Sequence, residues 1–284
     1  MLHKNPFCVD LTDKVVVITG AGGIMCNHFS KVVAQTGAKV AMLDINVEKA
    51  KLFADEISSE GYFAKAYYAD VLDKECLEEV KKQINEDMGT CDILINGAGG
   101  NNPRGNTDHE FFCSKDMKNG LKTFYQLDLS GFEFVFDLNF IGTLLPTQVF
   151  SIDMIGKEDC SVINISSMNA IKPLTKLPAY SAAKAAISNF TEWLATYFSK
   201  EGIRVNALAP GFFITNQNRS NLLTESGEYT KRAMKILSQT PMGRFGKIEE
   251  LSGALLFLLC KDASSFVTGI ILPIDGGFNT YCGV

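Results

Sequence analysis

Tyr180 and Lys184 are the two residues whose types and spacing point most directly to chemistry. They stand four positions apart in a stretch, 180–199, whose pattern predicts a helix, so their side chains share one helix face. A phenol has an ordinary pKa of about 10, and a neighbouring ammonium lowers it. The pair therefore predicts a tyrosine that moves a proton on a substrate oxygen. The alternative is a buried helix aromatic beside a surface lysine.

A glycine-rich turn follows the first run that predicts a buried strand, Lys14–Thr19. Residues 20–24 read Gly-Ala-Gly-Gly-Ile. Glycine lets the backbone turn tightly and approach a pyrophosphate, and the N-terminus of the following helix offers free N–H groups. The turn predicts a dinucleotide site, although a plain strand–helix turn would look the same.

Asp44 ends the second predicted strand and lies 24 residues after Gly20. A carboxylate at this place accepts hydrogen bonds from the ribose 2′-OH and 3′-OH of adenosine, and it repels a 2′-phosphate. No Arg occupies residues 43–46, so we expect NAD as NAD(H) rather than NADP. The alternative role for Asp44 is a helix N-cap, which Asn46 would serve better.

These residues need elements that bring them together, and the chain alternates apolar strand-like runs with amphipathic stretches. Such alternation predicts right-handed βαβ crossovers and a parallel sheet with helices on both faces. No linker divides residues 1–284, so we expect one domain, with a substrate-side excursion near 101–131 and a substrate loop near 211–246. The predicted strands are Lys14–Thr19, Lys39–Leu43, Ala64–Tyr68, Asp92–Asn96, Ser161–Ser166, Arg204–Ala209 and Gly269–Ile274. The predicted helices are a stretch that runs to Gln35, Val47–Ser59, Lys74–Met88, Phe132–Phe150, Tyr180–Ser199 and Ile248–Leu259.

Composition excludes several classes of partner. The 284 residues carry a net charge of −5 without a block of Lys and Arg, so neither nucleic acid nor an anionic membrane is an expected partner. Eight cysteines without a C-x-x-C pair and three scattered histidines predict no metal site. The N-terminus lacks an apolar signal segment, and the thiols favour a cytoplasmic protein.

Several motifs follow in order: Asn-Gly-Ala-Gly at 96–99, Asn139, Ser-Ser at 166–167, the pair at 180 and 184, and Pro-Gly at 210–211. Together they resemble the short-chain dehydrogenase/reductase family over nearly the whole chain, 14–277. The resemblance implies a doubly wound, Rossmann-like α/β three-layer sandwich with a seven-stranded parallel sheet. It also implies an oxidoreductase that acts on CH–OH groups, commonly as a tetramer, so we expect a homotetramer or a homodimer.

The resemblance assigns roles to individual residues. One departure is that Ile24 and Cys26 stand where the family's turn usually has glycine; Gly22 and Gly23 would compensate through a shifted turn. Ser167 is preferred to Ser166 because the family places its serine about thirteen residues before the tyrosine. The catalytic set is Asn139, Ser167, Tyr180 and Lys184. The cofactor contacts are Gly20, Gly22, Gly23, Ile24, Asp44, Asp70, Val71, Asn96, Ala98, Gly99, Tyr180, Lys184, Pro210, Gly211, Phe213 and Thr215.

Amides and cations gather in three segments, 99–104, 168–173 and the loop after Pro210. Amides suit a polyol and cations suit a carboxylate, whereas a steroid or acyl pocket would be apolar. We therefore expect a sugar-acid substrate, although solvated loop residues would give the same pattern. The candidate substrate contacts are Asn101, Asn102, Arg104, Ser167, Asn169, Tyr180, Asn216 and Arg219.

Within the family, residues 5–7, 99–103, 165–170 and 211–219 and the insert 107–131 resemble the D-mannonate oxidoreductase (fructuronate reductase) branch. That resemblance implies interconversion of D-fructuronate and D-mannonate with NAD(H). Gluconate 5-dehydrogenase is the main competing assignment. A non-catalytic dinucleotide-binding or interaction protein is the alternative of another class, against which the intact catalytic set argues.

Overall fold

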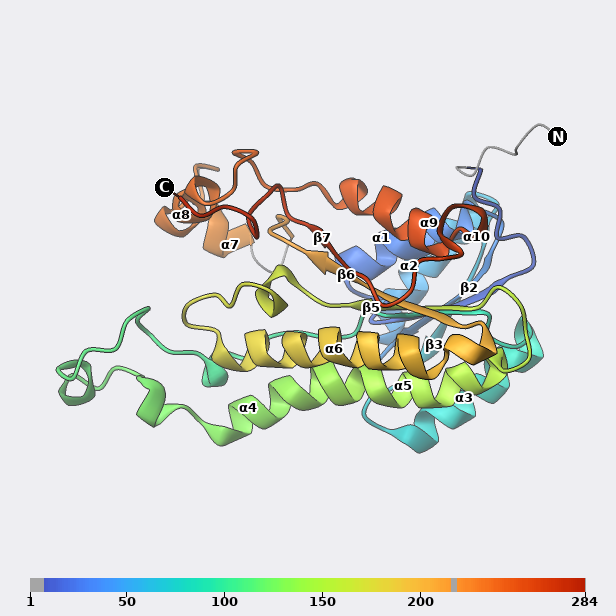
Figure 1. The fold of residues 1–284 in the computed structure, drawn as a ribbon, viewed down its shortest axis with the longest axis horizontal. Helices are drawn as coiled ribbons and strands as arrows, with labels where there is room; N and C mark the ends of the chain where they lie inside the picture. The colour runs from blue at the N-terminus through green and yellow to red at the C-terminus, as the bar shows by residue number, and fades with distance from the viewer. Residues whose placement is uncertain (1–7, 216–218, 284) are drawn as a thin grey trace.

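A seven-stranded parallel sheet forms the centre of the protein. The computed structural model describes residues 8–215 and 219–283. The strands lie in the order β3-β2-β1-β4-β5-β6-β7 (Figure 1), which confirms the predicted doubly wound α/β class. Their bounds are β1 Val15–Thr19, β2 Lys39–Asp44, β3 Phe63–Tyr68, β4 Ile93–Asn96, β5 Ser161–Ile165, β6 Arg204–Pro210 and β7 Ile271–Ile274.

The central strands read as continuous apolar runs because both faces of the sheet are covered. In β1, Val16 and Ile18 point into one core and Val15 and Val17 into the other. Helices α1, α2 and α9 cover the first face, and α3, α5 and α6 cover the second (Figure 1). The helices are α1 Ile24–Ala34, α2 Val47–Ser59, α3 Lys74–Asp87, α4 Leu129–Phe136, α5 Gly142–Phe150, α6 Pro178–Tyr197, α7 Arg219–Leu222, α8 Lys231–Ser238, α9 Ser252–Leu259 and α10 Lys261–Ser264.

The long helix predicted over 132–150 differs from the structure. It begins earlier, at Leu129, where Asp128 caps it by accepting a hydrogen bond from the Ser130 N–H. A π-helical turn, Asp137–Ile141, then separates α4 from α5. Such a turn widens the helix by one residue and re-aims the side chains that it carries, of which Asn139 is one. Periodicity cannot reveal it, because the apolar pattern continues on both sides.

The same segment is the one stretch of the described residues long and apolar enough to span a membrane. It runs over Leu129–Met154. Half of its most apolar window is buried, and α4 and α5 pack against α6 and α3. A core helix passes the same test of length and composition, so this is weak evidence for a membrane span.

Two irregular segments project from the carboxyl ends of the strands. The first, residues 97–128, contains 3-10 turns at Pro103–Gly105, Asp116–Lys118 and Phe124–Gln126. The second follows β6 and carries α7 and α8, which the sequence pattern did not resolve as separate helices. In Figure 1 both project toward the end of the molecule at which α6 begins. Ligands of doubly wound folds bind at this edge.

Candidate active site

A cleft of about 600 Å³ opens at the carboxyl ends of β1, β2, β4, β5 and β6. It is lined by the glycine turn, by the end of β2, by the loop after β4 and by the start of α6. Most of the predicted cofactor contacts meet here: Gly20, Gly22, Gly23, Ile24, Asp44, Asp70, Val71, Ala98, Gly99, Tyr180, Lys184, Pro210, Gly211 and Thr215.

The glycine turn is held directly by Asp44. The Gly22 N–H donates to Asp44 Oδ2 over 2.8 Å, and a Cβ on Gly22 would lie 2.9 Å from that oxygen. Oδ1 accepts from the Asn46 N–H over 2.8 Å, while the Asn46 side chain caps α2. Asp44 is therefore not the helix cap, and its carboxylate is fixed at the edge of the cleft with lone pairs to spare.

Cys26 explains how the turn tolerates a missing family glycine. Its side chain packs against the loop after β4, where a Cβ on Gly97 would lie 2.1 Å from its sulfur. Burial raises the pKa of the Cys26 thiol to about 12, so it stays protonated. The N-cap of α1 is Gly23, with no side-chain cap. Its first N–H groups are thus available to an anion, as a pyrophosphate requires.

Three of the four predicted catalytic residues, Ser167, Tyr180 and Lys184, lie together in the lining of the cleft. The Ser167 hydroxyl is hydrogen-bonded to Tyr180, which lowers the tyrosine's pKa against the larger effect of burial. The Lys184 ammonium lies 5.7 Å from the centre of the Tyr180 ring and donates to the Ile165 carbonyl over 2.8 Å. The neighbouring Ser166 hydroxyl instead lies 2.7 Å from that of Ser188 on α6, which supports the choice of Ser167.

The acidity of this pair differs from the expectation. Burial raises the pKa of Tyr180, and Lys184 does not offset that effect. Burial also lowers the pKa of Lys184 to about 8. The reason is that loss of water penalises both charged forms, a phenolate and an ammonium alike. A bound positive charge would therefore be needed to favour the phenolate.

The lowered pKa of Lys184 has a measurable consequence for stability. Below pH 8 the folded protein holds a buried ammonium that the unfolded chain holds in water, which is destabilising. As the pH rises from about 8 to about 10.5 this cost disappears, because the unfolded chain then binds more protons. The free energy of unfolding of the wild type, relative to Lys184→Met, should rise by about 2 kcal/mol between about pH 7 and about pH 9.5. Urea denaturation of both proteins would measure it, and a constant difference would contradict the buried ammonium.

Asn139 sits in the π turn and clamps the loop after β4. Its Nδ2 donates to the carbonyls of Gly100 and Val135, each over 2.7 Å, and its Oδ1 accepts from the Gly100 N–H over 3.2 Å. A Cβ on Gly99 would lie 2.7 Å from Asn139 Oδ1 and 3.2 Å from Lys184 Nζ. The amide and the ammonium thus meet at one glycine, with no room there for a larger residue.

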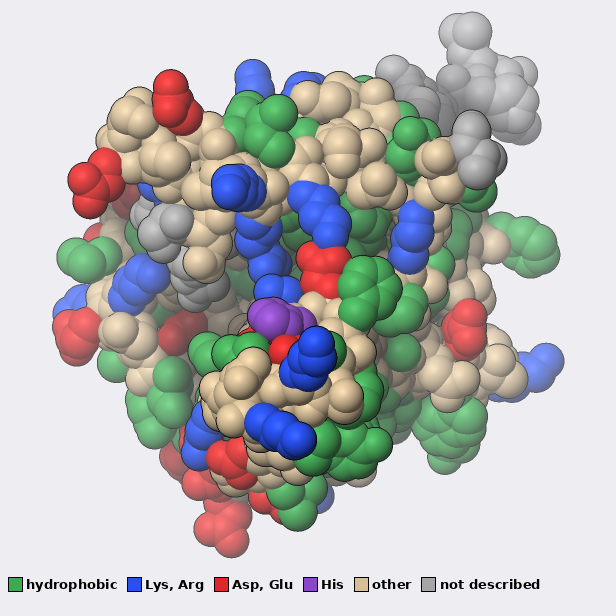
Figure 2. All heavy atoms as spheres, turned by 90° about the vertical axis from the view of Figure 1, so that its left-hand side faces the viewer, with side chains coloured by type: hydrophobic (Ala, Val, Ile, Leu, Met, Phe, Trp, Pro, Cys, Tyr) green, Lys and Arg blue, Asp and Glu red, His purple; other side chains and the backbone are tan. Residues whose placement is uncertain are grey.

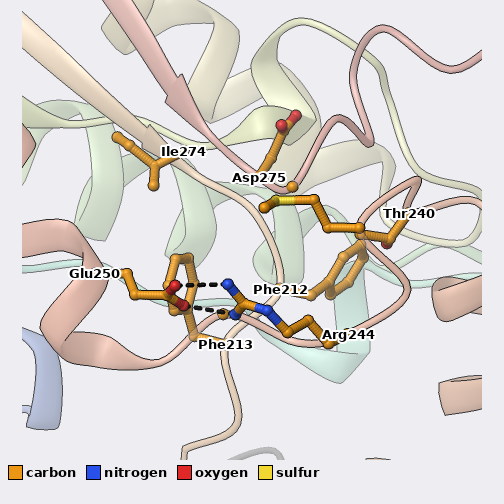
Figure 3. Close-up of a pocket in the computed structure, with 10 residues that line it drawn as sticks. Phe212, Phe213, Thr240, Arg244, Glu250, Ile274 and Asp275 are labelled. Atoms are coloured by element: carbon orange, nitrogen blue, oxygen red, sulfur yellow. Dashed lines mark hydrogen bonds and ion pairs between the residues drawn. The ribbon is translucent and has the colours of Figure 1, made fainter.

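Two predicted cofactor residues do not line the cleft. The Asn96 side chain is buried behind it and donates to Thr147 and Asn164, each over 2.9 Å, so it ties β4 to α5 and β5. Phe213 lines a separate pocket of about 100 Å³ together with Arg244 and Glu250 (Figure 3). A Cβ on Gly246 would lie 2.3 Å from the Phe213 ring, so this ring packs against the segment that precedes α9.

The predicted substrate residues are spread more widely. Asn101 lines the cleft. Asn102 caps a 3-10 turn, and the guanidinium of Arg104 donates to Ser130 at the start of α4 over 3.1 Å. Asn169 is buried beside Ser167, Arg219 is exposed at the start of α7, and Asn216 lies outside the described residues.

Sequence reasoning missed further residues that line the cleft. Lys49 adds a cation near Asp44, and the side chains of Leu138 and Ile165 form an apolar part of the lining. The place of Lys49 in the first turn of α2 was the available signal, since a helix start after β2 faces the same edge. Among the described residues, no group of three or more His, Cys, Asp or Glu side chains could hold a metal ion.

Comparison with known proteins agrees with this geometry. The sequence pattern described as short chain dehydrogenase matches residues 14–226. The chain belongs to the short-chain dehydrogenase family. It is an oxidoreductase of that family, and the family resemblance of the sequence is confirmed.

Three relatives show where the chain stands within the short-chain dehydrogenases. A protein of Haemophilus influenzae called an uncharacterized oxidoreductase is 58% identical over 275 residues, which cover 97% of this chain and 96% of its own. A crystal structure from the same species, provisionally described as a D-mannonate oxidoreductase with bound NAD, is 57% identical. It has a TM-score of 0.94 and covers 98% of this chain and 99% of its own. Gluconate 5-dehydrogenase of Gluconobacter oxydans is 32% identical over 274 residues, with 96% and 98% covered.

Proposed function

We propose that the protein is an NAD(H)-dependent enzyme that interconverts a keto group and a secondary alcohol on a sugar acid. The observation that carries this is the cleft in which Ser167, Tyr180 and Lys184 meet beside the glycine turn and Asp44. The cradle fits a dinucleotide. Gly20 and Gly22 have backbone or carboxylate where a Cβ would be, and α1 begins without a side-chain cap. The similar Haemophilus structure with bound NAD supports the same cofactor.

The residues of the cleft would have separate roles in binding the cofactor and in moving the proton. Asp44 would hold the adenosine ribose, the start of α1 the pyrophosphate, and Lys184 the nicotinamide ribose. The cofactor supplies a hydride to the carbonyl carbon when bound. Tyr180 gives its hydroxyl proton to the carbonyl oxygen, and Ser167 donates a hydrogen bond to that oxygen as charge develops. Asn139 would hold the floor of the site, and the positive charge of a bound oxidised nicotinamide would favour the phenolate that remains.

The substrate we propose is D-fructuronate, reduced to D-mannonate, or the reverse reaction. The provisional description of the 57% identical structure supports this, and three cations from two segments, Lys176, Arg232 and Lys235, act on Glu110 in the segment after β4. Reduction of a keto-gluconate, as the name of the 32% identical relative indicates for that protein, is the second candidate. Fructuronate and 5-keto-gluconate carry the keto group at the same carbon and differ in the configuration of the hydroxyl next to the carboxylate, so kinetics can separate them.

A substrate screen tests the proposal. NADH oxidation is followed with fructuronate, keto-gluconates, neutral keto sugars and simple ketones at matched concentrations. We expect kcat/KM to be highest for fructuronate. Activity confined to apolar ketones would rule out the sugar acid, and the highest value for a keto-gluconate would favour the second candidate.

Cofactor choice is predicted to depend on the charge of Asp44 and not on its hydrogen bond. Asp44→Asn keeps an oxygen for the Gly22 N–H but removes the charge, whereas Asp44→Ser removes both. Lys49 lines the same end of the cleft and would attract a 2′-phosphate. Removing the negative charge should therefore raise the affinity for NADPH relative to that for NADH by about 10- to 100-fold in both variants. Fluorescence titration of both cofactors gives the ratio. A wild type that binds NADPH more tightly would overturn the assignment to NAD.

We also propose a homotetramer or homodimer in the cytoplasm. Stacked rings run along α6 from Phe190 through Trp193 to Tyr197, and Trp193 and Tyr197 remain 55% and 66% exposed. Exposed aromatic rows of this kind favour a subunit interface. All eight cysteines lie in the described residues as free thiols, which supports a reducing compartment. Light scattering after gel filtration would give the subunit number, and a monomer at micromolar concentration would contradict the interface.

A further inference from the structure

An ion pair joins the two irregular segments at the carboxyl edge of the sheet. Glu110, in the segment after β4, pairs with Lys235 on α8. The Glu110 carboxylate is half-buried and its pKa is lowered, first by the hydrogen bond with Lys235 and then by the charges of Lys235, Lys176 and Arg232. Three cations from two different segments therefore surround one carboxylate.

This cluster is anchored to the catalytic side of the molecule. Ala233 and Ile236 bury the inner face of α8 against Met168, the residue after the catalytic Ser167. Lys176 lies four residues before Tyr180, and its carbonyl accepts from the Thr107 N–H over 3.1 Å. All the segments involved leave the sheet at the carboxyl ends of β4, β5 and β6, where the cleft opens. Lys176 thus lies on the segment that leads into Tyr180, and Arg232 and Lys235 lie on a helix whose inner face shares an apolar cluster with the residue after Ser167.

Figure 2 shows the face toward which both segments project. Lys and Arg side chains gather in its middle, with acidic side chains beside them. The four residues of the cluster, Glu110, Lys176, Arg232 and Lys235, carry an excess of positive charge. A carboxylate is the ligand such a cluster favours, and Glu110 already supplies one. A chain with a net charge of −5 would otherwise repel an anion.

We propose that Lys235, with Lys176 and Arg232, is the docking site for the carboxylate of the substrate, and that Glu110 is its built-in competitor. The substrate's carboxylate takes the place of Glu110 on Lys235, which releases the segment after β4 from α8. This inference rests on the proposed sugar-acid function. It makes Lys235 a residue that determines specificity, because a neutral ketone has nothing to exchange for Glu110.

The test is a pair of variants whose effects have opposite signs. Lys235→Gln should raise KM for the keto acid about tenfold with little change in kcat, because the anion loses its main cation. Glu110→Gln should lower KM several-fold, because the competitor is gone. Neither variant should change KM for a neutral ketone. Lys231→Gln, one turn before Lys235 on the same helix and outside the four-residue cluster, is the matched control for the loss of one positive charge.

A second measurement follows the ion pair between Glu110 and Lys235 without any substrate. Trypsin should cleave the segment after β4, at Lys115 or Lys118, faster in both Glu110→Gln and Lys235→Gln than in the wild type and in Lys231→Gln. If both variants move KM in the same direction, or if trypsin cleaves all four proteins at one rate, the docking site is wrong. A wild type that reduces neutral ketones and no keto acid would overturn the proposed function as well.

Discussion

Tyr180→Phe should lower kcat for reduction of the keto acid by about 10³-fold and leave the affinity for NADH nearly unchanged. The substitution removes only the hydroxyl that is hydrogen-bonded to Ser167. The ring keeps its packing against Val135, Ala179 and Ala183, so the cleft keeps its shape. Steady-state rates and NADH fluorescence titration measure the two quantities separately.

Tyr197→Phe is the matched control, because it removes the same atom from an exposed ring near the end of α6. Its kcat should equal that of the wild type. If Tyr180→Phe retained more than about a tenth of the wild-type kcat, another group would have to supply the proton. If neither the wild type nor the variant turned over any keto compound while both bound NADH, the non-catalytic alternative would be favoured.

Asn139→Ala should be the most destabilising substitution in the site. It leaves the Gly100 N–H and the carbonyls of Gly100 and Val135 without the Asn139 amide, a side chain that is itself fully buried. Each orphaned buried group costs about 1 kcal/mol or more, so the free energy of unfolding should fall by about 3 kcal/mol. Because the freed loop carries Gly99, cofactor affinity should fall as well, by about tenfold or more.

Thr147→Val separates these two effects. Thr147 is buried on α5, where its hydroxyl contacts Asn96 and the Thr143 carbonyl, away from the lining of the cleft. It should lower the free energy of unfolding and leave cofactor affinity intact. Urea denaturation and NADH titration of both variants provide the comparison. Equal losses of affinity in the two would mean that Asn139 acts only through global stability.

Sequence reasoning predicted the sheet well because its strands are buried on both faces. β1 and β5 are buried throughout and mostly apolar, so their position was unambiguous, with one end of each displaced by one residue. The edge strand β7 begins two residues later than expected, because Gly269 adopts φ +80° and cannot continue a strand. Asp44, Tyr180 and Lys184 were placed correctly in the cleft because spacing along regular elements fixes where they point.

What could not be predicted depends on contacts between distant segments. Asn96 follows the family motif, but its side chain turns to Thr147 because β5 and α5 offer buried partners behind β4. The Cys26 side chain fits where it lies only because residue 97, which is 71 positions away, is a glycine. The ion pair of Glu110 with Lys235 spans 125 positions and no periodicity connects them. Residue types and local spacing give no information about such contacts between residues that are distant in the sequence.

The close approach of the Phe213 ring to Gly246 constrains how this protein can evolve. The three nearest atoms that a Cβ on Gly246 would meet all come from the Phe213 ring, and Gly246 does not occupy the left-handed region. Alanine at 246 is therefore excluded by one neighbour and not by the backbone. Gly246→Ala should lower the stability of the present protein and should be tolerated once Phe213→Leu has occurred. The order of the two substitutions therefore decides whether both can accumulate. Descendants of this sequence would reach the double variant through position 213 first.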